Sequence, residues 1–520
     1  MTFEERPPVD ARAERLRQDV RRGSSAVFVA QIISQFVSLI VLSVLLRTLG
    51  LEPYGLLGMV LPLLALIRIF IYSGLDVAAI QEPSLDRQKA SALFWTNQIL
   101  GVLGTAIVAV SAPWLSWFYG REELVPLTLA LSGTMLVTTL GAQHQALLQR
   151  ELQLGRLSAI RVASQLIGGL CALVAAWAGA GLWTLVVQQY AEPAAQTVLA
   201  WVVTGWRPKL VLRGTGSREL LRFGGHYTVS AFLLYLLSHV DKILVGRFLG
   251  SQALAIYYQA FNLAQKPVSL VVSPLTGVML PALAHARSEM GLYRQYAVGF
   301  LRFLNWLMVP CGIGLALVAE ETMAVLGGPR WSGAGPILRI FALMIPFQAI
   351  FNVTGTIYAS LGRADRMARA CVPITGVMCF AFLVTVIFAA PLANALHVLA
   401  WVYFGTFSLS VLAYTGYAFW IIGLSPQTVL RATQSIWLGS LMMIIVVLGV
   451  RGACAWLGLR SVYILLSMEI VAGMLAYFLV TRQVSLEYLA SGVKGLWREP
   501  KERLSSNKVA NESHGGNRHD

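Results

Sequence analysis

The sequence predicts an all-α integral membrane protein with about 14 transmembrane helices. Hydrophobic residues make up 57% of the 520-residue chain and charged residues only 12%, whereas a soluble domain carries about 25% charged residues. The mean hydropathy is +0.66. Apolar stretches of about 20 residues, the length at which a helix crosses a bilayer, follow one another along the chain. They lack the period-two alternation of membrane barrel strands.

The individual spans follow from these apolar stretches in chain order. Polar residues interrupt two of them, with "YAEPAA" in the sixth and "NLAQKP" in the eighth. The first 23 residues contain six arginines and no small-residue cleavage site after a short apolar core, so we expect the first span to stay as an anchor. The predicted spans are 25–46, 54–74, 91–112, 124–146, 158–179, 181–204, 223–246, 253–281, 296–319, 334–360, 368–390, 392–422, 427–450 and 461–481.

Positive charge near the span ends predicts the orientation, because Lys and Arg are retained on the cytoplasmic side. The loops after spans 2, 4, 6, 8 and 10 hold "DRQKA", "QRELQLGR", "WRPKLVLRGTGSRELLR", "ARSEMGLYR" and "GRADRMAR". We therefore expect both termini in the cytoplasm. The formal net charge of +15 is mostly this topology signal, with contact to anionic lipid as a second contribution. No basic segment interleaves aromatic residues, so nucleic acid is not an expected partner.

A repeat of 200 residues relates two halves of the chain. The segments "VLLRTLG" and "LVGRFLG" align Arg47 with Arg247 and Gly50 with Gly250. Six spans lie between them, an even number, so both halves enter the membrane from the same side. We predict two six-helix lobes related by a pseudo-two-fold axis along the membrane normal, plus two C-terminal helices. The expected parts are a cytoplasmic tail 1–24, an N-lobe 25–206, a basic cytoplasmic linker 207–222, a C-lobe 223–424, helices 13 and 14 within 425–482, and a polar cytoplasmic tail 483–520.

Polar and ionisable residues inside spans are candidates for a substrate pathway, because each is costly in lipid. In the first span Gln31 and Gln35 belong to a polar stripe at helical spacing, which would alternatively serve hydrogen bonding between helices. Arginines near span ends would alternatively reach lipid headgroups. The candidate substrate-binding residues are Arg68, Lys266, Arg302, Arg339, Gln31, Gln35, Asn262 and Gln265.

A second set of charged residues is a candidate for ion coupling or gating. Asp241 and Lys242 lie about 9 Å short of Arg247 along a helix, so they face a cavity, pair across helices or form a purely structural pair. Cations outnumber acids in the two sets together, which favours an anionic cargo such as a pyrophosphate. The coupling or gating candidates are Asp241, Lys242, Glu192, Arg47 and Arg247.

No motif predicts an enzyme. The chain lacks a phosphate loop of the GxxxxGK[ST] type, and its seven histidines are dispersed. No outer loop is long enough to fold by itself around a catalytic carboxylate. The five cysteines show no metal-ligand spacing. We therefore expect neither a metal nor a cofactor.

Several segments carry a resemblance to a known family, among them "HQALLQRELQLGRLSAIRVASQLIGG", "LWTLVVQQY" and above all "DKILVGRFLGSQALAIYYQAFNLAQKP". Over roughly residues 25–290 the chain resembles the polysaccharide-transporter (Wzx-type) flippases of the multidrug/oligosaccharidyl-lipid/polysaccharide exporter superfamily. The resemblance implies a transporter that moves undecaprenyl-pyrophosphate-linked oligosaccharide across the bacterial inner membrane for exopolysaccharide, capsule or O-antigen synthesis. It further implies alternating access driven by an ion gradient, with membrane lipid and polysaccharide polymerase and copolymerase proteins as partners.

By the same resemblance, Asp241 and Arg247 match positions that the family usually keeps. Family members commonly have Asn near that aspartate, where this chain reads "HVDK", so Glu192 is a rival coupling acid. Two other functions stay open. A multidrug-type small-molecule or cation antiporter of the same superfamily would have a cavity lined chiefly by acids, and a membrane enzyme of glycan assembly would have a catalytic carboxylate on an outer loop.

Overall fold

The computed structural model describes residues 9–72, 87–151, 153–210, 217–459, 461–482 and 484, and within these ranges its regular structure is entirely helical. Most of the predicted C-terminal tail and part of the predicted linker lie outside the described residues. The α-helices are α1 Val9–Leu49, α2 Leu51–Tyr72, α4 Arg87–Tyr119, α5 Leu124–Ser132, α6 Thr134–Arg150, α7 Leu154–Trp177, α8 Trp183–Thr204, α9 Ser217–His285, α10 Met290–Leu317, α11 Ala319–Gly327, α12 Ala334–Ala342, α13 Ile345–Ser360, α14 Ala364–Ala389, α15 Ala395–Ile422, α16 Pro426–Trp456 and α17 Val462–Val480.

The helices confirm a multi-pass membrane protein. Among the described residues, ten helices are long and apolar enough to cross a bilayer, or up to 12 when each of two bent pairs is taken as one span. The number 14 stays a prediction. Helix α8 is not one of the ten, because Glu192 and three glutamines lower the hydropathy of an otherwise apolar helix of 22 residues.

Two predicted spans are each built from two shorter helices. Span 124–146 consists of α5 and α6, which meet at Gly133. Span 334–360 consists of α12 and α13, bent by 42°. Pro346 lies in the first turn of α13, where its missing N–H is tolerated because a new helix begins there. Helix α1 begins at Val9, well before the predicted start of the first span.

The 200-residue repeat has a counterpart in the backbone. Gly50 has φ +77° and Gly250 has φ +86°, a left-handed region that residues with a Cβ rarely adopt. At Gly50 the chain passes from α1 into α2, and Gly250 is the non-helical residue within α9. Both repeat units therefore end in the same kind of tight glycine turn. The pseudo-two-fold axis stays a prediction.

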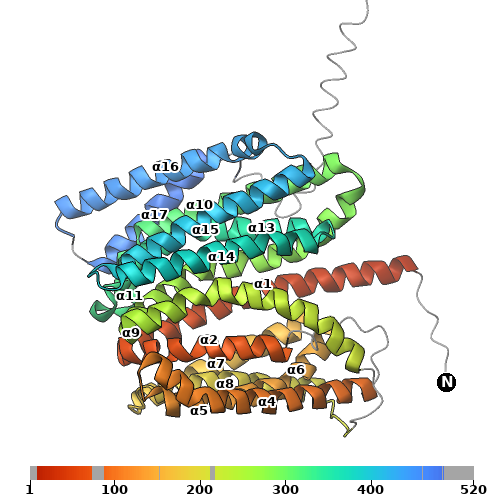
Figure 1. Cartoon of the computed structure of the whole chain (residues 1–520). Coiled ribbons are helices and arrows are strands. Elements are labelled where there is room, and N and C mark those ends of the chain that lie inside the picture. Colours follow the sequence, from red (N-terminus) through yellow and green to blue (C-terminus); the bar gives the residue numbers. More distant parts are fainter. Residues whose placement is uncertain are drawn as a thin grey trace, which may run out of the picture.

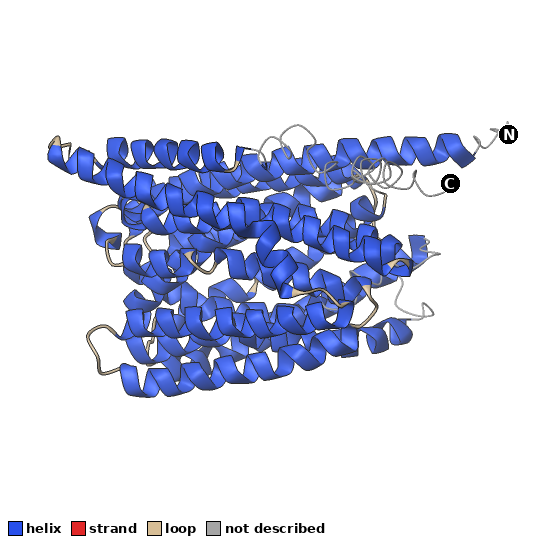
Figure 2. Cartoon of the chain, turned by 90° about the horizontal axis from the view of Figure 1, so that it is seen from above, coloured by secondary structure: helices blue, strands red, loops and turns tan. Residues whose placement is uncertain are grey.

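The helices stack in chain order. Figure 1 shows α2 and α4–α8 in the lower part of the view, α10 and α13–α17 in the upper part, and α1 and α9 between them. Figure 2 shows that the helices run in roughly one direction, with the loops gathered at two ends. We call the end that carries Gly50 and Gly250 the Gly50 end.

The outer surface of the bundle is apolar. Val110 on α4, Phe388 on α14 and Trp456 on α16 are 80%, 75% and 86% exposed. A soluble monomer rarely exposes so much contiguous apolar surface, whereas lipid tails accommodate it at no cost. The interior of the second half contains aromatic clusters, in which the Phe341 ring packs edge-on against the Tyr257 ring at 4.9 Å between centroids.

The two C-terminal helices are attached through one buried ionic cluster. Arg451 on α16 donates to Glu469 on α17 at 2.8 Å and to Glu321 on α11 at 2.9 Å. The Glu469 side chain is fully buried. The arginine thereby satisfies two carboxylates and fixes α16 and α17 on the neighbouring α11, because a buried acid without such a partner would be strongly destabilising.

Candidate functional site

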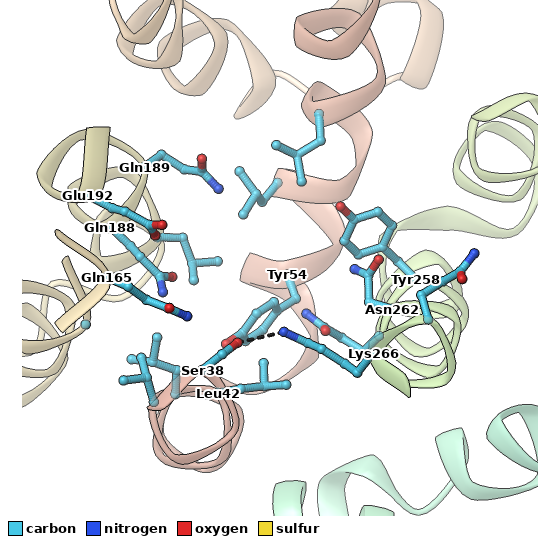
Figure 3. Close-up of a pocket in the computed structure, with 18 of the residues that line it drawn as sticks. Ser38, Leu42, Tyr54, Gln165, Gln188, Gln189, Glu192, Tyr258, Asn262 and Lys266 are labelled. Carbon is cyan, nitrogen blue, oxygen red and sulfur yellow. Dashed lines mark hydrogen bonds between the residues drawn. The ribbon is translucent and has the colours of Figure 1, made fainter. Parts of the chain in front are cut away.

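A cavity of about 670 Å³ lies between α1, α2, α6, α7, α8 and the second half of α9 (Figure 3). Ser38 on its lining is 12 residues from Gly50, a helical rise of about 18 Å. The cavity is therefore near the middle of a hydrocarbon layer about 30 Å thick. Its charged lining residues are Arg68, Glu192 and Lys266, and its amide-bearing ones are Gln35, Gln165, Gln188, Gln189, Gln196, Gln259, Asn262 and Gln265.

One wall of the cavity is formed by α8 with a contribution from α7. Gln188, Glu192 and Gln196 are spaced four residues apart on α8, which places them on one face of the helix. Figure 3 shows Gln188, Gln189, Glu192 and Gln165 extending into the cavity from the same side. Helices α7 and α8 approach closely here, since a Cβ on Gly168 would be only 2.6 Å from the Cβ of Glu192.

The opposite wall is formed by the second half of α9. Tyr258, Asn262 and Lys266 again recur at four-residue spacing, and Figure 3 shows all three facing the α8 wall. The Nζ of Lys266 donates a hydrogen bond of 2.7 Å to the Oγ of Ser38 on α1. This contact orients the ammonium toward the cavity and connects the two halves of the chain.

Helices α1 and α2 complete the lining with groups that have unused hydrogen-bonding capacity. The Nε of Arg68 and the Oε1 of Gln35 are buried and have no hydrogen-bond partner among the described residues. Ser34 donates to the side-chain oxygen of Gln165, which ties α1 to α7. Buried polar atoms are nearly always paired in folded proteins, so these two orphans mark a place where a ligand supplies the partner.

The cavity has a small positive charge and an internal polarity. Its two cations, Arg68 and Lys266, outnumber its one acid, Glu192. Glu192 and Lys266 are on opposite walls (Figure 3), and each lies within the electrostatic field of the other. Because the acid and the ammonium come from different halves of the chain, any movement of one half against the other changes their separation.

Asp241 and Lys242 are near the cavity in sequence but enclosed in the structure. The Lys242 Nζ is 3.2 Å from both carboxylate oxygens of Asp241, donates to the Ser238 carbonyl at 2.6 Å, and is 4.0 Å above the centre of the Phe261 ring. Asp241 is fully buried, and neither residue is among those that line the cavity. Of the alternatives left open by the sequence, this geometry matches a pair that neutralises itself within the core.

The Gly50 end is closed by contacts between the two halves of the chain. Ser43 donates to the Leu326 carbonyl at 2.9 Å, and Trp331 donates to the Leu46 carbonyl at 3.0 Å. Arg47 donates to the same Leu326 carbonyl at 3.4 Å.

A second set of contacts joins α2 to α9 at the same end. Ser251 donates to Glu52 at 2.7 Å, and Arg121 is 3.2 Å from the same carboxylate. The backbones are so close that a Cβ on Gly55 would be 2.0 Å from the Ser251 carbonyl oxygen.

The structure brings six of the predicted site residues together and separates the others. Arg68, Lys266, Gln35, Asn262, Gln265 and Glu192 line the cavity. Arg339 instead pairs with Glu320 at 2.8 Å on the exposed surface, and the half-buried Arg302 lies on α10. The predicted residues outside the lining are Gln31, Arg302, Arg339, Asp241, Lys242, Arg47 and Arg247.

Several lining residues had no role in the sequence-based prediction. Gln165, Gln188, Gln189 and Gln196 line the α7–α8 side, and Gln259 lines the α9 side. The usable signal was the recurrence of amides at helical spacing around Glu192, because an isolated amide in a span is ambiguous whereas a stripe of them defines a wet face.

Comparisons with known proteins agree on the family. The model of a family described as polysaccharide biosynthesis protein matches residues 44–336. The chain is 30% identical over 338 residues to the teichuronic acid biosynthesis protein TuaB of Bacillus subtilis, covering 65% of this chain and 69% of that protein. It is 24% identical over 385 residues to the lipopolysaccharide biosynthesis protein WzxC of Escherichia coli, covering 74% and 77%.

Solved structures share the fold at low sequence identity. The lipid II flippase MurJ in an inward closed conformation aligns with a TM-score of 0.70 at 13% identity, covering 90% of this chain and 99% of that one. An inward-facing MATE multidrug transporter aligns with a TM-score of 0.57 at 14% identity, covering 76% and 94%. The chain therefore belongs to the polysaccharide-transporter (Wzx-type) flippase family of the multidrug/oligosaccharidyl-lipid/polysaccharide exporter superfamily, whose members are membrane transporters and not enzymes.

Proposed function

We propose that the protein translocates undecaprenyl-pyrophosphate-linked oligosaccharide repeat units across the bacterial inner membrane for exopolysaccharide, capsule or O-antigen biosynthesis. The observation that carries the proposal is a positively charged cavity of about 670 Å³ at mid-height of an apolar bundle. A cavity of this size holds a diphosphate and adjoining sugars, while the prenyl chain stays in the surrounding lipid. The names of TuaB and WzxC, which refer to biosynthesis of teichuronic acid and lipopolysaccharide, support a cargo of this class.

Arg68 and Lys266 are the proposed ligands of the diphosphate. A guanidinium binds phosphate oxygens through two parallel hydrogen bonds, and an ammonium acts as a compact point charge. Lys266 is already oriented by Ser38, and Arg68 has a buried Nε without a described partner. Asn262 and Gln265 on the α9 wall, with Gln35 on α1, would hold the neighbouring groups.

Alternating access would proceed by rocking the proposed N-lobe 25–206 against the proposed C-lobe 223–424. We assign the Gly50 end to the outer face, because the basic loops lie at the opposite end and are retained in the cytoplasm. Opening outward would break the contacts of Ser43, Trp331 and Ser251 across this end. Both termini would be cytoplasmic, and polymerase and copolymerase proteins would receive the cargo outside.

Glu192 is the proposed coupling acid. An ion gradient drives a conformational change only through different ion affinities in the two states, and the Glu192 environment changes when Lys266 on the other wall moves. Asp241 lacks this property, because Lys242 is attached to the same helix and neutralises the carboxylate in place.

The test is a gene deletion complemented by variants. Wild type and Arg339→Ala should restore polymer, whereas Lys266→Ala should leave complete repeat units on undecaprenyl pyrophosphate at the cytoplasmic face. Arg339→Ala is the matched control because it removes a cation that is outside the cavity. Unchanged polymer in the deletion strain, together with new sensitivity to toxic cations, would refute the proposal in favour of a multidrug-type antiporter.

A further inference from the structure

The cavity is rich in one kind of side chain, the uncharged amide. Eight lining residues are glutamine or asparagine and three are charged. An amide offers two N–H donors and an acceptor oxygen, which is the same mixture of donating and accepting that a sugar hydroxyl presents. The amides are distributed over both walls, with Gln165, Gln188 and Gln189 facing Asn262 across the cavity in Figure 3. A hydroxyl-rich ligand can therefore be bound from both sides.

The charge of the described lining leaves little capacity for further anions. A diphosphate diester carries about two negative charges, and the two cations of the lining, Arg68 and Lys266, balance them. The remaining charge is Glu192, which has the wrong sign for an acidic sugar. A uronic acid placed against the α8 wall would therefore face a like charge in a site that contains no additional described cation.

One buried orphan points to a hydrogen-bond donor from the cargo. The Oε1 of Gln35 is a buried acceptor with no partner among the described residues. Leaving such an atom unsatisfied is costly. A hydroxyl can donate to it, whereas an ionised carboxylate cannot, since it only accepts hydrogen bonds.

We infer that the cavity selects a repeat unit whose sugars next to the diphosphate are uncharged and hydroxyl-rich, and that Glu192 excludes acidic sugars. This inference rests on the proposed function, which assigns a diphosphate-linked saccharide to the cavity. The α9 wall with Lys266 binds the diphosphate, and the amides of the α8 wall bind the sugar. Glu192 accepts hydrogen bonds from sugar hydroxyls and repels a carboxylate.

The experiment compares two lipid probes on the purified full-length protein in nanodiscs. One probe is undecaprenyl pyrophosphate linked to glucose, and the other is the same lipid linked to glucuronic acid. We expect the glucose probe to bind at least about tenfold more tightly, a difference of about 1.4 kcal/mol. Glu192→Gln should reduce that ratio to below about threefold while binding the glucose probe as a folded protein. Gln189→Glu, which adds a second acid to the same wall, should enlarge the ratio.

Glu320→Gln is the matched control, because it removes an acid that is paired with Arg339 on the surface outside the cavity, and it should leave the ratio unchanged. Equal or tighter binding of the glucuronic acid probe by the wild type would overturn the inference and leave the proposed function intact. A ratio that is identical in wild type and Glu192→Gln would also overturn it. If neither probe binds and undecaprenyl pyrophosphate alone also fails to bind, the proposed function itself is refuted.

Discussion

Two acids, Glu192 and Asp241, have basic partners in very different settings. Asp241 is fully buried, and Lys242 of the same helix satisfies both of its oxygens. Glu192 lines the cavity and faces Lys266 from the other half of the chain. A pair that moves as one unit contributes to folding but has no reason to respond to cargo. A pair divided by a cavity can be separated by cargo, by an ion or by a movement of the walls.

The largest effect on stability is expected at the enclosed pair. Asp241→Asn leaves the Lys242 ammonium buried without its counter-charge, and breaking such a pair costs about 3–5 kcal/mol. We expect most of the folded, monodisperse protein to be lost in detergent, as measured by fluorescence-detected size exclusion. Adding Lys242→Met removes the stranded charge and should restore much of the folded fraction. If Asp241→Asn instead folds normally and abolishes polymer export, Asp241 is a working group and the comparison fails.

The next largest effect is expected at the pair across the cavity, and it should appear in transport rather than in stability. Lys266→Ala removes hydrogen bonds to a charged group, each contributing about 1.5–3 kcal/mol, so polymer output should fall at least about tenfold. The thermal midpoint should change little, because the side chain faces an open cavity. Lys266→Arg keeps the charge and should retain part of the output. Equal loss in both variants would argue against a role in binding charge.

A smaller effect, confined to conformation, is expected at the Gly50 end. A Cβ on Gly55 would be 2.0 Å from the Ser251 carbonyl oxygen, so Gly55→Val should separate α2 from α9 there. The measurement is labelling of Ser38→Cys by an impermeant maleimide added from outside, with the Ser38→Cys protein that retains Gly55 as the reference. We expect labelling to rise several-fold. Unchanged labelling would mean that this contact does not keep the outer end closed.

The smallest effect is expected at the exposed ion pair. Arg339 and Glu320 are 46% and 53% exposed, and such pairs contribute about 0–1 kcal/mol because solvent screens them. Arg339→Ala should leave polymer output within about twofold of wild type, measured at matched protein level. A loss as large as that of Lys266→Ala would return Arg339 to the substrate pathway.

Helical spacing was sufficient to predict part of the site. Asn262, Gln265 and Lys266 recur on one face of an otherwise apolar span, and such a stripe needs a wet surface wherever the span packs. The same argument applies to Glu192 and the glutamines around it. The multi-pass helical fold follows from hydropathy, because only a helix satisfies its own backbone in lipid.

Other features depend on packing that the pattern along one helix does not contain. Adjacent residues on a helix do not face each other, so spacing gave no reason to expect the Asp241–Lys242 pair. It forms because a long lysine side chain surrounded by Phe261 and other apolar groups bends back to the nearest acid. Arg339 lies in a predicted span, but the span is broken at its outer part, which brings the arginine to Glu320 at the surface.

The most direct test of the cavity as the translocation site uses the purified full-length protein in proteoliposomes. Undecaprenyl-pyrophosphate-linked repeat units are placed in the outer leaflet, and their arrival in the inner leaflet is followed by protection from an added pyrophosphatase. We predict that wild type protects the lipid far faster than empty vesicles, that Lys266→Ala is close to empty vesicles, and that Arg339→Ala matches wild type. Equal protection by wild type and Lys266→Ala would contradict the assignment of this cavity as the route of the cargo.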